Sequence, residues 1–251
     1  GVVPVAKARM SDDGRVLVVE RFDVDDRGAP THGLEDACGL LGLPPHEKYA
    51  TTTERVLHAT RAYLPSAQVR AQLERFGWHL LTSYVVRNAD CHAKNVALFY
   101  TSLSDVGYTP VYDVVTTQAY PRYANSPPAL SVDGRQTWAP GRTLERFFNA
   151  RLGLSPRRYA EMVERLCESA VEVGREVIEA ARNEPRWRSV AKQMVHAWND
   201  GMSSLRDPRK SVAFRGLEHA IVAAGFSDPE PPERARTSTG RSESLAPRRR
   251  R

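Results

Sequence analysis

Three polar residues near the middle of the chain, Asp90, Asn95 and Asp113, have types and positions that could support chemistry. Asp90 follows a long segment with periodic apolar residues, Asn95 begins a short apolar run, and Asp113 follows the next run. Transfer of a phosphoryl group from ATP uses such a set, because one carboxylate accepts the proton of the attacking hydroxyl while an Asn and a second Asp hold Mg²⁺. The sequence therefore predicts that these side chains converge at the mouth of a hairpin.

The spacing Asp-x-x-x-x-Asn between Asp90 and Asn95 is typical of kinase catalytic loops. The ordinary alternative is a helix-end turn and a strand cap, because Asp and Asn readily hydrogen-bond to nearby backbone groups. A predicted helix before the pair and a predicted hairpin after it favour the catalytic interpretation. Asp113 supports it as well, since an acid inside an apolar run usually requires a partner or a metal.

Two predicted elements would position these residues. Residues 66–86 have apolar side chains at intervals of three and four, which predicts a long buried helix with Ser66 as its N-cap. Residues 95–100 and 108–111 are apolar runs joined by a polar turn, which predicts a hairpin. The order around Asp90 is therefore helix, loop and hairpin.

The sequence of the N-terminal part predicts a further hairpin and two short helices. Residues 2–10 and 15–22 flank the turn-rich sequence Ser-Asp-Asp-Gly, which predicts a hairpin at the start of the chain. Residues 35–42 predict a short helix with acidic residues in its first turn, and residues 51–62 predict another helix.

The C-terminal part is predicted to be helical. The pattern is helical from residue 143 almost to residue 226, with residues 159–181 as the longest segment. Prolines interrupt it at Pro156, Pro185 and Pro208. The whole chain thus reads as an α+β protein that is mainly α-helical.

Composition restricts the class of protein. A chain of 251 residues with 41% hydrophobic residues can bury a substantial core. A mean hydropathy of −0.48 and the lack of an apolar run of about 18 residues exclude an integral membrane protein. No secretory signal opens the sequence, and the three cysteines, Cys38, Cys91 and Cys167, show no pairing pattern. We therefore expect a cytoplasmic protein with no membrane partner.

The net charge of +6 is unevenly distributed along the chain. Residues 227–251 contain seven Arg against four acidic residues, together with several Pro, Ser and Thr, and we expect a disordered basic tail there. The remaining surface is nearly balanced in charge, so it gives no argument for direct binding of nucleic acid.

The central motifs resemble those of a known family. Residues 88–95, Asn-Ala-Asp-Cys-His-Ala-Lys-Asn, and residues 108–114, Tyr-Thr-Pro-Val-Tyr-Asp-Val, are similar to the core of HipA-type toxin kinases. These are the serine/threonine kinases of bacterial toxin–antitoxin modules. Residues 17–23, Leu-Val-Val-Glu-Arg-Phe-Asp, resemble the hinge of that family. The similarity covers residues 1–226 and implies a protein-kinase-like, HipA-like C-lobe with a remnant of the N-lobe strands and hinge.

The resemblance also implies roles for individual residues. Asp90 would be the catalytic base, and Asn95 and Asp113 would hold Mg²⁺. The main chain around Glu20, Arg21 and Phe22 would contact the adenine of ATP. Other contacts with the nucleotide would come from His92, Lys94 and Tyr112. Asn95 and Asp113 would complete the nucleotide site. Structural alternatives remain open: Glu20 and Phe22 could simply end a strand, His92 could stabilise the loop, and Lys94 could be solvated.

Parts that kinases place ahead of the hinge have no counterpart in this sequence, namely the Gly-rich phosphate loop and the strand lysine. Lys7 superficially matches that lysine, but only eight residues separate it from the hinge strand. This is too short for the helix and the additional strand that lie between the lysine and the hinge in kinases. We therefore expect residues 1–23 to be an N-lobe remnant and hinge, residues 24–226 the helical lobe, and residues 227–251 the tail of a truncated kinase. We expect this chain to transfer phosphate slowly, because the loss of one preorganised group that stabilises charge in the transition state typically lowers the rate by about 10²–10³.

The resemblance implies partners too: a DNA-binding, HipB-like antitoxin, and a protein substrate in translation such as an aminoacyl-tRNA synthetase. DNA would be contacted at most indirectly, through the antitoxin. Two other interpretations stay open, a catalytically dead relic that binds antitoxin and a small-molecule phosphotransferase.

A thiol nucleophile at Cys91 is not expected beside His92, since sequence neighbours seldom face one another. A zinc site is not expected either, because the cysteines lie more than 50 residues apart.

Overall fold

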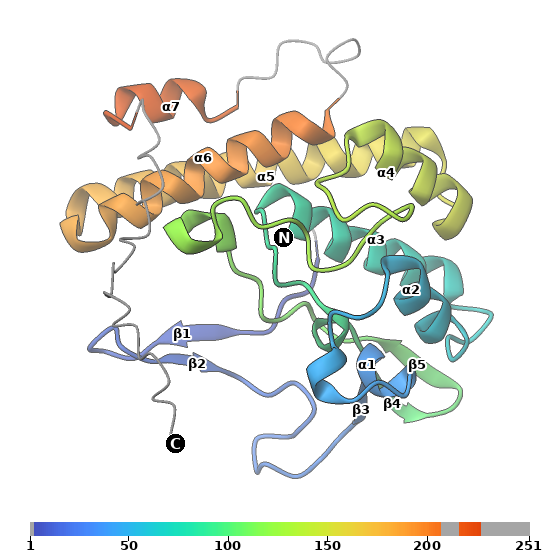
Figure 1. Cartoon of the computed structure of the whole chain (residues 1–251). Helices are drawn as coiled ribbons and strands as arrows, with labels where there is room; N and C mark the ends of the chain where they lie inside the picture. Colours follow the sequence, from blue (N-terminus) through green and yellow to red (C-terminus); the bar gives the residue numbers. More distant parts are fainter. Residues whose placement is uncertain (1–2, 207–215, 227–251) are drawn as a thin grey trace, which may run out of the picture.

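The computed structural model describes residues 3–206 and 216–226. Helices α5 (Pro156–Asn183) and α6 (Arg188–Leu205) lie side by side across one end, and α3 (Val69–Val85) packs against both (Figure 1). Two small sheets and short helices form the other end (Figure 1). The prediction of a mainly helical α+β chain is confirmed. The predicted tail and Pro208 lie outside the described residues.

The chain opens on the predicted hairpin, although its strands are shorter than expected. Strands β1 (Ala8–Met10) and β2 (Leu17–Val19) pair antiparallel and form their own two-stranded sheet. At their turn the amide of Ser11 donates to the Val16 carbonyl at 2.8 Å, and Gly14 has a φ of +68° that glycine adopts without steric cost.

The second sheet contains a strand that the sequence did not predict. Strands β4 (Ala97–Ser102) and β5 (Asp105–Tyr108) form the expected hairpin, and β3 (Gly33–Asp36) pairs antiparallel with the other edge of β4. The prediction of a helix over residues 35–42 was therefore wrong at its start, because pairing with β4 overrides the local helical pattern. Only α1 (Ala37–Leu40) is helical there.

The predicted second hairpin strand, residues 108–111, is also displaced. The strands connect more tightly than expected, with an irregular register between Tyr100 and Ser102, so β5 begins at Asp105 and ends at Tyr108. Pro110 has no backbone N–H to give to the ladder. Val111 instead forms an isolated parallel bridge with Val5, which ties the N-terminal segment to the exit of the hairpin.

Helix α3 is the predicted long helix, but Ser66 does not cap it. The helix begins at Val69, and residues before it form a turn in which the Gln68 amide donates to the Pro65 carbonyl at 2.9 Å. Pro65 favours that turn, and the N-cap of the helix is therefore Gln68, two residues later than predicted. Helix α2 (Thr53–Arg61) matches its prediction and has Thr52 as a side-chain N-cap.

The C-terminal helices agree with the predicted breaks. Helix α4 (Gly141–Phe147) leads into a π-helical turn, and α5 starts with Pro156 in its first turn behind Ser155, whose hydroxyl accepts from the Arg158 amide at 3.2 Å. Helix α7 (Glu218–Ala223) is the last described element. The remaining short helices are η1 (Pro45–Glu47), η2 (Ala93–Asn95), η3 (Thr117–Ala119), η4 (Pro121–Tyr123), η5 (Phe148–Leu152) and η6 (Pro185–Trp187).

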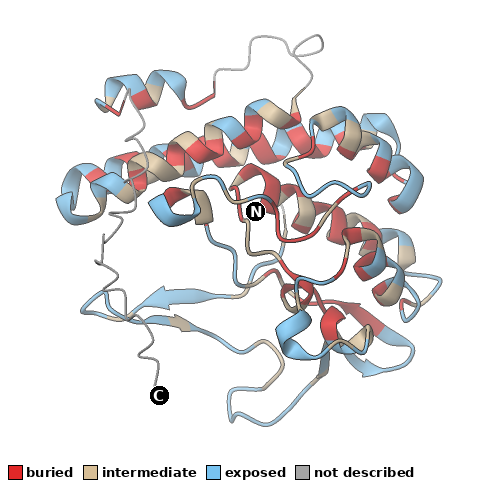
Figure 2. Cartoon of the chain, viewed as in Figure 1, coloured by how far each residue is buried: buried red, intermediate tan, exposed pale blue. Residues whose placement is uncertain are grey.

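The core lies where α3, α5 and α6 face one another, and the outward faces of α5 and α6 are largely exposed (Figure 2). Within the described ranges, no helix is both long and apolar enough to cross a membrane. Gly201 of α6 sits directly on the end of α3, because a Cβ there would lie 2.1 Å from the Val85 carbonyl oxygen. This close crossing fixes where α3 ends and where the following loop begins.

We predict that Gly201→Ala destabilises the fold, since the new methyl group would meet backbone that cannot rotate away. The expected loss is about 1–3 kcal/mol in the free energy of unfolding by urea, which is typical of overpacking. Ser203→Ala, an exposed change on the same helix, serves as the control and should stay within about 0.5 kcal/mol. Equal stability of the two variants would contradict the close α3–α6 crossing.

Candidate active site

The loop over residues 88–95 is held in one shape by its own hydrogen bonds. Arg87, with a φ of +54°, turns the chain away from α3. The Asp90 amide donates to Asn88 Oδ1 at 3.1 Å, and the His92 amide donates to the Asp90 carbonyl at 2.9 Å. Thr117 adds an external tie, because its hydroxyl donates to the Arg87 carbonyl and accepts from the Ala89 amide.

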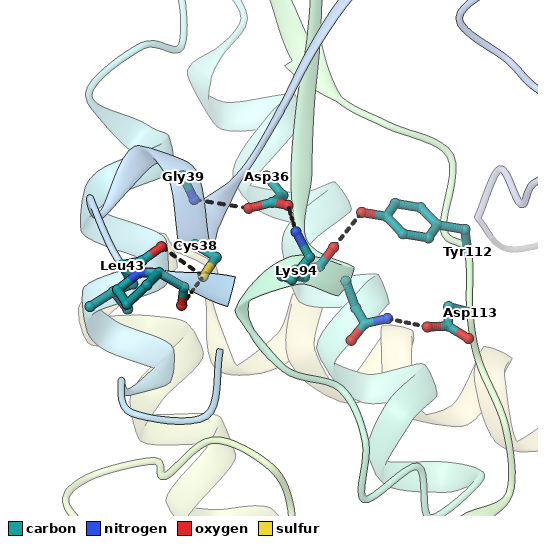
Figure 3. A network of polar contacts seen from close by, with 9 residues as sticks. Asp36, Cys38, Gly39, Leu43, Lys94, Tyr112 and Asp113 are labelled. Atoms are coloured by element: carbon teal, nitrogen blue, oxygen red, sulfur yellow. Dashed lines mark hydrogen bonds and ion pairs between the residues drawn. The ribbon is translucent and has the colours of Figure 1, made fainter. Parts of the chain in front are cut away.

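The structure brings two of the three predicted chemical residues into direct contact. Asn95 is only 2% exposed, and its Nδ2 donates to Asp113 Oδ2 at 2.7 Å (Figure 3 shows this bond). The other side of the amide is used as well, since Asn95 Oδ1 accepts from the His92 amide at 3.1 Å. Asp113 has a left-handed φ of +56°, a conformation that Asp tolerates better than most residues.

Asp90 lies in the same loop and has a partner that sequence reasoning missed. The hydroxyl of Tyr49 donates a short hydrogen bond to Asp90 Oδ1. Burial and this carboxylate raise the pKa of the Tyr49 phenol to about 12, so the phenol remains protonated at neutral pH. Both residues line an open pocket of about 610 Å³, whose other lining residues are Ala89, Val115, Thr117, Tyr120, Tyr123 and Ser126.

Lys94 and Tyr112 form a second polar network next to Asp113 (Figure 3). Lys94 Nζ pairs with Asp36 Oδ2 at 2.7 Å, and the Tyr112 hydroxyl donates to the Lys94 carbonyl at 2.6 Å. Asp36 raises the pKa of Lys94, which keeps the ammonium charged. The other oxygen of Asp36 accepts from the Gly39 amide at 2.9 Å as the N-cap of α1. Asp36 therefore joins the sheet, α1 and the 88–95 loop.

The hinge residues take different positions. The Phe22 ring lies 6.0 Å from the Tyr112 ring and 6.4 Å from the Phe99 ring, so it packs at the edge of the network. Glu20 and Arg21 are exposed, and they form ion pairs with Lys7 and Asp23, respectively. If the main chain of Glu20 and Arg21 contacted adenine, the ion pairs of their side chains could remain intact.

His92 is buried, and its ring meets the Tyr49 ring edge-on with centroids 5.1 Å apart. Burial lowers its pKa, so the imidazole is neutral near pH 7. Its backbone contacts with Asp90 and Asn95 show that it helps to shape the loop, in agreement with the structural alternative for this residue.

The donor chemistry of Asn95 and Asp113 fits Mg²⁺, because a carboxylate and an amide oxygen are hard ligands. These residues supply two donors, and a bound nucleotide would supply others. Among the described residues there is no group of three or more His, Cys, Asp or Glu side chains placed to hold a metal.

Cys91 belongs to the 88–95 loop, and its sulfur is 3.7 Å from Nε2 of the buried His79. Burial raises the pKa of the Cys91 thiol to about 11 and lowers the pKa of His79 to about 4. The thiol is therefore protonated at neutral pH.

Comparison with known proteins decides the family. Residues 1–173 match the family described as HipA-like C-terminal domain, which is more than half of the chain. The chain belongs to this family. The HipA-like match includes the hinge segment, the 88–95 loop and the hairpin, so it contains every residue of the site described above.

Curated relatives in this family carry kinase names. "Putative kinase Y4mE" of Sinorhizobium fredii is 35% identical over 131 residues, which cover 48% of this chain and 29% of that protein. A protein named "Putative kinase" from Haemophilus influenzae is 28% identical over 120 residues, which cover 44% of this chain and 33% of that protein. The HipA-like chain therefore aligns with about a third of the length of these relatives.

A solved structure shows the same fold. HipA of Shewanella oneidensis, determined in a complex with HipB and its operator DNA, matches with a TM-score of 0.54 and 19% identity. The match covers 90% of this chain and 50% of that HipA chain. The kinase-like, HipA-like fold is thereby confirmed for the described part.

The sequence analysis did not predict two long-range contacts at the candidate site. Tyr49 reaches Asp90 across 41 positions, and Asp36 reaches Lys94 across 58 positions. Asp36 had been assigned to the first turn of a helix, whereas it caps one, and Tyr49 lies in a turn with no local chemical pattern. No short-range signal could have revealed either contact.

We predict that the two roles of Asp36 can be separated by substitution. Asp36→Asn removes the charge opposite Lys94 but keeps an oxygen for the Gly39 amide, so a loss below about 1 kcal/mol is expected for this half-exposed pair. Asp36→Ala removes the cap as well and should cost about 1 kcal/mol more in urea unfolding. Identical stabilities would show that the cap contributes nothing.

We also predict that His79 makes the protein sensitive to acid. The unfolded chain binds a proton near pH 6.5, whereas the folded protein binds it only near pH 4, so stability is present above pH 6.5 and falls between these values. The expected loss is up to about 3 kcal/mol. His79→Gln should flatten this part of the curve of unfolding free energy against pH, and an unchanged curve would assign the acid sensitivity elsewhere.

Proposed function

We propose that this chain is the catalytic C-terminal lobe of an ATP- and Mg²⁺-dependent protein serine/threonine kinase. The observation that carries the proposal is the direct contact between Asp113 and Asn95 of the loop that also contains Asp90. All three residues lie within the part that matches the HipA-like family. The open pocket beside Asp90 would admit the segment that bears the acceptor hydroxyl.

In the proposed reaction, Asp90 accepts the proton of the attacking serine or threonine hydroxyl. Asn95 and Asp113 hold Mg²⁺, which neutralises charge on the phosphates when it is bound. His92, Lys94 and Tyr112 would contact the nucleotide, and the main chain around Glu20, Arg21 and Phe22 would meet the adenine. We propose residues 1–23 as the hinge and N-lobe remnant, residues 24–226 as the catalytic lobe, and residues 227–251 as a tail.

We further propose that the protein is the toxin of a toxin–antitoxin module. The solved HipA with a similar fold was determined together with HipB and operator DNA, which supports a HipB-like antitoxin as the partner here. The substrate would be a protein of the translation machinery, such as an aminoacyl-tRNA synthetase, and the setting cytoplasmic.

Substitution of the two aspartates tests the proposal in the complete gene product. Asp90→Ala should lower phosphoryl transfer from ATP by about 10²–10⁴ while ATP binding persists, because the base touches the acceptor and not the nucleotide. Asp113→Ala should abolish transfer and remove the Mg²⁺ dependence of ATP binding, measured by calorimetry with and without EDTA. Asp12→Ala, an exposed change in the β1–β2 turn, is the control. Normal transfer by either site variant would exclude its assigned role.

A further inference from the structure

Tyr49 contacts the proposed base but lies outside the 88–95 loop and the 108–114 segment. It follows η1, on the segment between α1 and α2. The Ala93 amide donates to the carbonyl of the preceding residue, Lys48, at 3.1 Å, and the Tyr49 ring packs edge-on against His92. The backbone and the ring of Tyr49 are thus placed without help from its hydroxyl.

The hydroxyl has a single recorded partner in the described structure, which is Asp90 Oδ1. Burial does not force this contact, because Tyr49 is 46% exposed and its hydroxyl could bond to water instead. The raised pKa of the phenol, about 12, means that the hydroxyl is a donor at any physiological pH. The bond is therefore a persistent contact from a protonated donor to a carboxylate.

The hydrogen bond from Tyr49 affects the orientation of the Asp90 carboxylate. The backbone of this residue is held by Asn88 and His92, but its carboxylate is free to rotate about the side-chain torsions unless it is held by a side chain. Tyr49 occupies Oδ1 and leaves Oδ2 with its lone pairs to accept another proton donor. A fixed rotamer with one free oxygen is what a general base needs.

We propose that Tyr49 is a positioning residue that orients the Asp90 carboxylate toward the acceptor pocket. This inference rests on the proposed kinase function and deepens it. Tyr49 acts through Asp90 and takes no proton itself, so it is not a catalytic residue. Both residues line the same pocket, so Tyr49 also forms part of the wall of that pocket.

Tyr49→Phe is the matched test, since it retains the ring contact with His92 and removes only the hydroxyl. In the complete gene product, with casein as acceptor and radiolabelled ATP, we expect kcat to fall about 10–100-fold while the KM for ATP stays within about twofold, because the base remains but loses its alignment. Tyr63→Phe, an equally exposed tyrosine at the end of α2, is the control and should match the wild type.

A double substitution separates orientation from general structural damage. If Tyr49 acts through Asp90, then adding Tyr49→Phe to Asp90→Asn should lower the residual rate no further. A further loss in that background would assign Tyr49 to another role and overturn the proposal. A higher kcat/KM in Tyr49→Phe would overturn it too, because it would show that the phenol blocks the acceptor.

A structural measurement keeps this inference separate from the kinase proposal. If the wild type shows neither phosphoryl transfer nor Mg²⁺-dependent binding of ATP, the proposed function fails, but a crystal structure of Tyr49→Phe still tests the positioning role. We expect the Asp90 carboxylate to occupy a different or a second rotamer in that variant. A single unchanged rotamer would refute orientation by Tyr49, whatever the activity.

Discussion

The hydrogen bond between the buried Asn95 amide and Asp113 is the interaction on which the arrangement of the site depends. It joins the loop that follows α3 to the segment that leaves the β4–β5 hairpin. A buried amide needs partners on both sides, and Asn95 finds them in Asp113 and in the His92 backbone. The loop, the hairpin and α3 must therefore keep one mutual arrangement for this amide to be satisfied.

The charges around this bond are arranged in two separate groups. Asp90 lines the open pocket and Asp113 is bonded to Asn95, whereas the ammonium of Lys94 pairs with Asp36, which caps α1. His92 is buried and neutral, so it adds no positive charge beside the two acids. Such an acid-rich site suits a divalent cation, in keeping with the function proposed for a member of the HipA-like family.

Sequence patterns predicted the elements that depend on local chemistry. The helices expected within residues 66–86, 51–62 and 159–181 are present as α3, α2 and α5, because apolar periodicity reports the buried face of each helix. The predictions of secondary structure were wrong where the conformation of a segment depends on its neighbours. Strand β3 exists because β4 offers it an edge, and α3 starts late because Pro65 imposes a turn on residues 66–68.

The same division applies to the site. The sequence by itself determined which residues could do chemistry, since the order Asp90, Asn95 and Asp113 along a loop and a hairpin is a local pattern, and it determined the resemblance to HipA-type kinases. Only the tertiary structure decided that Tyr49 meets Asp90 and that Asp36 meets Lys94. The physical reason is that both contacts arise from the packing of the segment around α1 against the loop, and no spacing within one element encodes such packing.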